Sequence, residues 1–179
     1  RTIAAAANKL YHYIDAQFKE INLAPPPLWY GSRGIVGGRD YPAKNVIDYF
    51  DISGSANNAV DFGDLITQRY GGAALSNETR AVFVSGYNTT GPVTLTSMEY
   101  VTCATTSNAT SFGENTYGAT GMSCWSNGIL GGSIGGWSGD ASVGTISYLT
   151  IATAGNAASA GALGYNTSDH VSVNNDTRC

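Results

Sequence analysis

Four aspartates early in the chain are the residues whose type and spacing could support catalysis: Asp48, Asp51, Asp61 and Asp64. Glycoside hydrolysis requires two carboxylates that face each other across a substrate. The sequence repeats internally, as shown below, and the later copies do not keep these positions. Asp51 aligns with threonine in both later copies, and Asp64 aligns with a glutamate and then an alanine. We therefore interpret these aspartates as turn-capping and solvated residues.

Other catalytic patterns are missing from the sequence. The two histidines, His12 and His170, form neither an HxxxH nor an HxH motif, so we predict no metal site. The glycine-rich run from Gly131 to Gly139 has neither the GK[ST] ending of a phosphate loop nor GxGxxG spacing. No GxSxG nucleophile elbow or Cys–His arrangement occurs. The expectation is a protein without a cofactor that is not an enzyme.

Two tryptophans are candidate ligand-binding residues. Trp125 and Trp137 could stack on sugar rings if their side chains are exposed. Alternatively, they fill space where the other copies carry smaller residues, and we favour this second interpretation. Five N-x-[ST] sequons occur, but an Asn- and Thr-rich β protein generates such triplets by chance.

The composition excludes several classes of protein. Only 12% of residues are charged, the net charge is −4, and the nine Lys and Arg are scattered, so we expect no nucleic-acid binding. No apolar run reaches the ~18–20 residues of a transmembrane helix, which predicts no membrane insertion. The three cysteines form no CxxC pair, and we expect free thiols. Abundant Gly, Tyr, Thr and Val favour sheets joined by tight turns.

The chain contains three copies of one motif. Ser32–Gly38 recurs as Thr79–Gly86 and again as Ser126–Gly132. The intervals from Arg33 to Arg80 and from Arg80 to Asn127 are both 47 residues, and residues 177–179 match the start of a fourth copy. The repeat positions that we single out in this block are Gly37, Gly38, Arg80, Gly86, Gly131 and Gly132.

Two further blocks recur in the same order. Tyr49, Tyr100 and Tyr148 each follow an apolar and a polar residue and precede an apolar, a polar and another apolar residue, as in a half-buried strand. In the next block Phe62 matches Phe112, whereas the third copy has alanine there. We therefore expect three superimposable sheets with the three tyrosines at equivalent positions.

Each copy holds about four short strand-like segments separated by Gly, Asn and Ser turns. One four-stranded sheet cannot bury both faces, but stacked sheets can, which is the propeller solution. The predicted class is all-β, with blades over residues 33–79, 80–126 and 127–177 and a fourth repeat beginning at 178–179. Three blades form an incomplete ring, because propellers typically need four to eight.

These blocks resemble kelch repeats. The resemblance lies in the apolar-Gly-Gly turn, the tyrosine some ten residues later, the aromatic-x-x-Leu element Phe62–Leu65 and the following Arg69. It covers residues 33–177, with Phe where kelch usually carries Trp and no clear counterpart of Arg69 in the later copies. It implies kelch-like β-propeller blades.

A second resemblance is to repeats in tail-associated virion proteins of tailed, cyanophage-like bacteriophages. It rests on Arg33–Gly38, Ile146–Ala157 and Asp61–Leu65 taken together. It implies a structural or adhesion protein in the virion tail or its fibres, which presents loops to a host-surface glycan or receptor. Partners would be other virion proteins or further copies of itself. The alternatives are a cellular kelch-type interaction module and a carbohydrate-active or oxidase-like propeller enzyme.

Residues 1–32 differ from the rest. Apolar residues between Ile3 and Ile21 fall at spacings of three and four, which predicts an amphipathic helix of about 20 residues. Pro25–Pro27 would end it and form a stiff spacer. This helix would either cap an open edge of the array or anchor it in a larger assembly.

Overall fold

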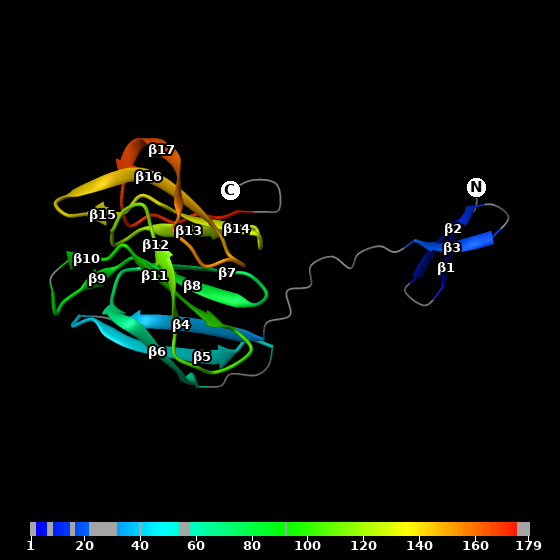
Figure 1. Ribbon diagram of the computed structural model, residues 1–179, viewed down its shortest axis with the longest axis horizontal. Coiled ribbons are helices and arrows are strands. Elements are labelled where there is room, and N and C mark those ends of the chain that lie inside the picture. The colour runs from blue at the N-terminus through cyan, green and yellow to red at the C-terminus, as the bar shows by residue number, and fades with distance from the viewer. Residues whose placement is uncertain are drawn as a thin grey trace.

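The computed structural model describes residues 3–6, 9–14, 17–21, 32–39, 41–53, 58–91 and 93–174. Every regular element in these residues is a β-strand, and all strand pairings are antiparallel, so the all-β prediction is confirmed. Figure 1 shows three sheets stacked on one another, from β4–β6 at one end to β16 and β17 at the other. Among the described residues no helix is long and apolar enough to cross a membrane.

The three stacked sheets are meanders of neighbouring strands. The first sheet holds β4 (Arg33–Arg39), β5 (Lys44–Asp51) and β6 (Val60–Arg69). The second sheet holds β7 (Ala73–Ser76), β8 (Arg80–Val84), β11 (Ser97–Thr102) and β12 (Thr110–Glu114). The third sheet holds β13 (Ser123–Ser126), β14 (Leu130–Ile134), β16 (Ala141–Thr150) and β17 (Ala158–Thr167). Short strands β9 (Tyr87–Asn88), β10 (Val93–Thr94) and β15 (Trp137–Ser138) lie in the loops.

The three tyrosines occupy equivalent positions in the three sheets. Tyr49 lies opposite Ile35 and Val60, Tyr100 opposite Val82 and Thr110, and Tyr148 opposite Gly132 and Ala158. In each sheet the pairing between the last two strands also shifts register just before the tyrosine, between the two residues that precede it. The extra residue at that bulge is Phe62, Phe112 or, in the third sheet, Ala160, and a glycine with positive φ follows each.

The sheets and the sequence copies are offset by one strand. β7 lies within residues 33–79, yet it pairs with β8 of the next copy, and β13 likewise pairs with β14. The first and second copies therefore each contribute three main strands to one sheet and the first strand of the following sheet. Among the described residues the first sheet has three strands, the second has four, and the third has five, of which β15 is only two residues long.

The third copy has a different register from the one that its double glycine predicts. Gly131 and Gly132 lie inside β14, opposite Leu149 and Tyr148. In the third copy, Gly135 takes the position that Gly38 has in the first copy and Ser85 has in the second. The φ values of these residues are 75° for Gly38, 54° for Ser85 and 59° for Gly135. A Cβ on Gly131 would meet Leu75 of the second sheet, and one on Gly132 would meet the Ser147 carbonyl oxygen and the Trp125 ring. This pair of glycines thus makes room for close neighbours, including the side chains of Leu75 and Trp125, rather than forming a turn.

Two apolar clusters fill the spaces between the sheets. The cluster between the first and second sheets comprises Ile47, Phe62, Leu65, Ala81, Phe83, Val101 and Ala109. The cluster between the second and third comprises Leu75, Val82, Val84, Met98, Phe112, Ala119, Met122, Leu149 and Ile151. Residues of β8 alternate between the two clusters, because successive side chains of a strand point to opposite faces. The second sheet is therefore buried on both faces.

The expected N-terminal helix is wrong. The described residues of this region form a separate antiparallel sheet of β1 (Ile3–Ala6), β2 (Lys9–Ile14) and β3 (Gln17–Ile21). In this sheet Leu10 lies opposite Ile21 and Tyr13 opposite Phe18. The helical spacing arose from adding apolar positions across different strands, whereas Tyr, Ile and Phe locally favour a strand. The proline run lies outside the described residues.

Candidate functional site

A hydrogen-bonded lock joins each sheet to the next, and it is built from the same sequence block each time. The Asp64 N–H donates to Asn108 Oδ1 at 3.0 Å, and the Ala109 N–H donates to the Asp64 carbonyl at 2.8 Å. One junction further along, the Glu114 N–H donates to Asn156 Oδ1 at 3.0 Å, and the Ala157 N–H donates to the Glu114 carbonyl at 2.8 Å. We call the Asn-Ala pair the plug and the Gly-Asp or Gly-Glu pair the cradle.

The glycine of each cradle is required by the closeness of the plug. A Cβ on Gly63 would lie 2.4 Å from the Ser107 carbonyl oxygen, and one on Gly113 would lie 2.3 Å from that of Gly155. Both glycines have φ near 145°, at 147° and 144°, where side chains are also disfavoured. The Phe-Gly-Asp block of the sequence is therefore a device for bringing neighbouring sheets into contact.

Arginines form a second contact between sheets. Arg33 Nη1 donates to the Cys103 carbonyl at 2.9 Å, and Arg80 Nη1 donates to the Ala152 carbonyl at 2.7 Å. Each guanidinium also lies over a repeated tyrosine ring of its own sheet, Arg33 at 4.6 Å from the centroid of Tyr49 and Arg80 at 4.5 Å from that of Tyr100. We call these two contacts arginine staples.

A buried ion pair adds to the first junction. Arg69, at the end of β6, reaches Glu99 of the second sheet and donates from Nη1 to the Ser85 and Ser97 carbonyls, each at 2.9 Å. Glu99 also accepts from the Ile66 N–H at 2.6 Å and the Thr67 N–H at 3.1 Å. Burial lowers the pKa of Arg69, and the nearby Glu99 opposes that shift. Both charges are engaged in structural bonds, as buried charges must be.

An uncharged network takes the place of this pair at the second junction. Asn115 Nδ2 donates to Ser133 Oγ at 3.0 Å, and Ser147 Oγ donates to Asn115 Oδ1. Tyr117 donates from its hydroxyl to the Thr145 carbonyl at 3.1 Å, and burial raises its pKa to about 12. Sequence reasoning missed Arg69–Glu99 and Asn115 as contact residues, because each occurs in only one copy. The sequence signal for such contacts is the polar residue before each repeated tyrosine, because Glu99 and Ser147 at that position are both buried.

A row of aromatic side chains lies on one rim of the stack. The rings of Tyr41 and Tyr70 have centroids 6.2 Å apart, and those of Tyr70 and Tyr87 are 5.7 Å apart. The backbones of Tyr70 and Tyr87 pair as an isolated antiparallel β-bridge. Thr120 and Trp137 pair in the same way one sheet further along. Trp137 is 46% exposed and Tyr41 is 74% exposed. We call Tyr41, Tyr70, Tyr87 and Trp137 the rim aromatics; Tyr70 and Tyr87 are half-buried.

The other sequence candidates are dispersed. Trp125 is half-buried beside Gly132 and is not part of the rim. Asp48 and Asp61 are opposite each other on β5 and β6, whereas Asp51 accepts bonds from the Ser53 N–H and hydroxyl, which lower its pKa. His170 lies near Gly135, and the side chain of His12 is outside the described residues. No group of three or more His, Cys, Asp or Glu in the described part of the chain could hold a metal ion.

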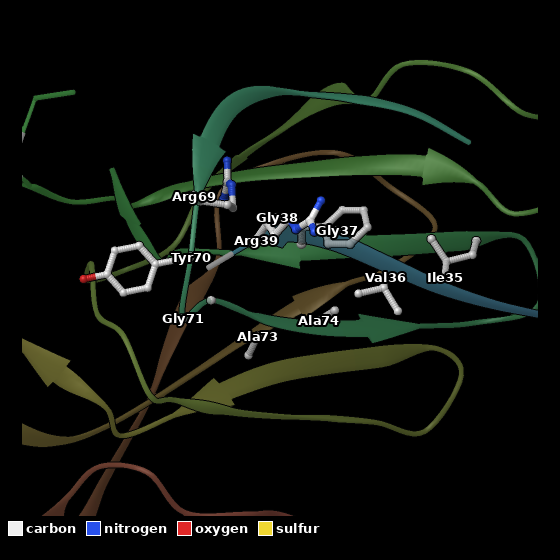
Figure 2. A pocket seen from close by; sticks show the side chains of 12 residues that line it. Ile35, Val36, Gly37, Gly38, Arg39, Arg69, Tyr70, Gly71, Ala73 and Ala74 are labelled. Atoms are coloured by element: carbon white, nitrogen blue, oxygen red, sulfur yellow. The ribbon is translucent and has the colours of Figure 1, made fainter. Parts of the chain in front are cut away.

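Two cavities lie between the first and second sheets, with volumes of about 390 and 430 Å³. The smaller one is lined by residues that include Val36, Gly38, Tyr70 and Phe83, and Figure 2 shows Arg69 at its edge. The described residues that line it include no carboxylate, and the buried guanidinium of Arg69 is already paired with Glu99. Cys103 lines the larger cavity and is free, as is Cys124, whose pKa burial raises to about 12.

Comparison with known proteins supports a likeness of fold. No family model matches the chain, and no curated protein matches its sequence. Among solved structures the chain is similar to YjhT, a β-propeller-type protein, with a TM-score of 0.61 and 11% sequence identity. The similarity covers 89% of this chain and 61% of that chain, so the chain spans less than two thirds of YjhT. At this identity the similarity concerns the fold alone.

Proposed function

We propose that the stacked sheets are kelch-like β-propeller blades that form part of a ring, and that the chain is a non-enzymatic attachment protein. The observation that carries this proposal is the contrast between conserved junctions and divergent rim loops within one chain. The same plug and cradle hold both junctions, whereas the loops after β8 and β14 carry different residues, Tyr87 in one and Trp137 in the other. A rigid frame with variable loops is typical of proteins that present binding surfaces.

The rim aromatics are the surface that we assign to attachment. Aromatic rings with a polar edge stack on sugar rings and donate hydrogen bonds to their hydroxyls. Tyr41, Tyr87 and Trp137 lie on loops of three successive sheets, so the frame fixes their spacing. The proposed ligand is a host-surface glycan, and the proposed location is a phage tail or tail fibre. Support for that location is the resemblance of Arg33–Gly38, Asp61–Leu65 and Ile146–Ala157 to repeats of tail-associated virion proteins.

Glycan binding is tested with the purified chain on an array of bacterial surface glycans. We expect Trp137→Ala and Tyr41→Ala to lower binding at least tenfold. Tyr148→Ala is the control, because Tyr148 is exposed and lies toward the other end of β16 from Ser142, the pairing partner of Trp137. Equal binding by all three variants would contradict the role of the rim.

Location in the virion needs a separate test. Antibodies raised against the chain should label the tail of phage particles that encode it. Particles with unlabelled tails would exclude the virion proposal and leave the glycan result to stand by itself.

A further inference from the structure

The third sheet carries a cradle that no plug among the described residues occupies. Gly161 follows the bulge of β17 and matches Gly63 and Gly113 in register, since Ile146, Ile47 and Met98 are their respective partners. Its φ of 114° is again in the range that disfavours side chains. A Cβ on Gly161 would meet no heavy atom within 4 Å, whereas a Cβ on Gly63 or Gly113 would clash with the carbonyl of the residue before the plug. The third sheet therefore keeps the costly backbone of a cradle without the contact that explains it.

The first sheet carries a plug that meets no cradle in the part of the chain that the structure describes. Asn58 and Ala59 precede β6 as Asn108 and Ala109 precede β12, and both are exposed. In contrast, Ala109 is buried against the first sheet. The plug acts through the Asn side chain and the Ala N–H, and the cradle acts through its backbone N–H and carbonyl. The replacement of Asp64 and Glu114 by Ala162 in the third cradle therefore removes none of the bonding groups.

The residues after the third sheet follow the same backbone path as the residues just before the second and third sheets. The Gly121 N–H donates to the Gly71 carbonyl at 2.9 Å before β13 begins, and the Asp169 N–H donates to the Gly121 carbonyl at 2.8 Å. All three residues have positive φ, at 63°, 58° and 55°. Asn174 then bonds to Ser126, as Ser126 bonds to Ser76. Residues 171–174 thus hold the position of a first strand, and Val171 is 91% exposed there.

We propose that the third sheet of one copy of this chain binds the first sheet of a second copy, head to tail. The Asn58–Ala59 plug of the second copy enters the Gly161 cradle. Its β4, β5 and β6 then stack on β17 as each sheet stacks on its predecessor. Figure 1 shows these two surfaces at opposite ends of the stack, so one chain cannot bring its own plug to its own cradle. This association is separate from attachment and does not depend on what the rim aromatics bind.

The same geometry indicates a reversible contact. Leu130 stands where Arg80 stands in the second sheet, because they are opposite Thr150 and Thr102 respectively. A copy docked on the third sheet is therefore held by the plug, but this junction lacks the arginine staple that each of the other two junctions has. The interface is also heterologous, so copies close into a ring if their rotation allows it and otherwise extend.

The test measures the mass of the purified chain by light scattering as its concentration rises. We expect the average mass to increase above that of the monomer. Ala59→Trp should block the plug and Gly161→Leu should block the cradle, each raising the dissociation constant at least tenfold. Both sites are exposed in the monomer, and circular dichroism and a melting curve check that each variant folds; Asn58→Ala is a milder plug variant.

A mixture of the two variants tests the head-to-tail arrangement directly. The plug variant keeps an intact cradle and the cradle variant keeps an intact plug, so the mixture should form 1:1 dimers although each variant alone is monomeric. A wild-type chain that stays monomeric at its highest soluble concentration would overturn the proposal. Association that survives both variants, or variants that do not complement each other, would overturn it equally.

Discussion

Arg69 and Glu99 form an ion pair across the first sheet junction, with side chains only 3% and 2% exposed. The guanidinium also bonds two carbonyls of the second sheet, and the carboxylate bonds two N–H groups of the first. Each partner therefore neutralises the other and satisfies backbone groups of the opposite sheet. Removing one partner leaves the buried charge of the other without an opposite charge beside it.

We expect Arg69→Met to lower the free energy of unfolding by about 3–5 kcal/mol, because it leaves Glu99 buried and unpaired. Urea unfolding monitored by tryptophan fluorescence measures the change. Arg39→Met is the matched control, since Arg39 is exposed on the same sheet and its replacement should change stability by no more than about 0.5 kcal/mol. Equal stability of the two variants would show that the ion pair does not hold the junction.

The plug asparagines should differ in their contributions to stability. Asn108→Ala and Asn156→Ala each remove the side-chain acceptor of a junction bond, and each should cost about 0.5–1.5 kcal/mol. Asn58→Ala, measured at a concentration where the chain is monomeric, should cost nothing because its plug is exposed. A loss at Asn58 as large as the others would mean that the lock is not what these side chains provide.

Alanine substitutions at two glycines separate backbone strain from steric contact. Gly113→Ala and Gly161→Ala share the strain of a positive φ, about 1–3 kcal/mol. Only Gly113→Ala also drives a Cβ to within 2.3 Å of the Gly155 carbonyl oxygen. Thermal melting of dilute samples should therefore show a clearly larger fall for Gly113→Ala. Similar melting temperatures for the two variants would argue against the close approach of plug and cradle.

Tyr117 should make stability fall at alkaline pH. Its pKa rises from 10.0 to about 12 on folding, so the folded chain keeps a proton that the unfolded chain releases. Its contribution is complete below pH 10 and is lost as the pH rises toward 12. Tyr117→Phe should flatten that part of the pH profile of the urea midpoint. Loss that begins nearer pH 9 should remain, because the Cys124 pKa also rises, from 9.0 to about 12. An unchanged profile would contradict the assignment.

The sequence predicted the repeating strands better than the contacts between them. The pattern around Tyr49, Tyr100 and Tyr148 located equivalent strand positions, because alternation of apolar and polar residues reports directly on a half-buried strand. The third copy was misaligned at Gly131 and Gly132, since a glycine pair that makes room for Leu75 and Trp125 looks the same in sequence as one that forms a turn. Gly135 and Gly136 hold the turn position.

Two other features could not be read from local pattern. Periodicity over residues 3–21 predicted a helix, because apolar residues on several short strands can reproduce helical spacing when the turns between them are ignored. Arg69 and Glu99 are 30 residues apart and occur in one copy only, so neither spacing nor repetition connects them. The polar column Asp48, Glu99 and Ser147 resembles a solvated strand face, although two of its three members are buried.

The one-strand offset between copies and sheets determines how a gene encoding such an array can grow or shrink. Duplication of one copy inserts three strands of one sheet together with the strand that opens the next. The peptide chain therefore connects each inserted copy to the next sheet, because the copy supplies the first strand of that sheet. The plug and cradle of the inserted copy match those of the copies on either side. Unequal recombination between copies can thus change the length of the array without creating an unmatched junction inside it. Selection could then act on the rim loops of the added copy while the frame stays the same.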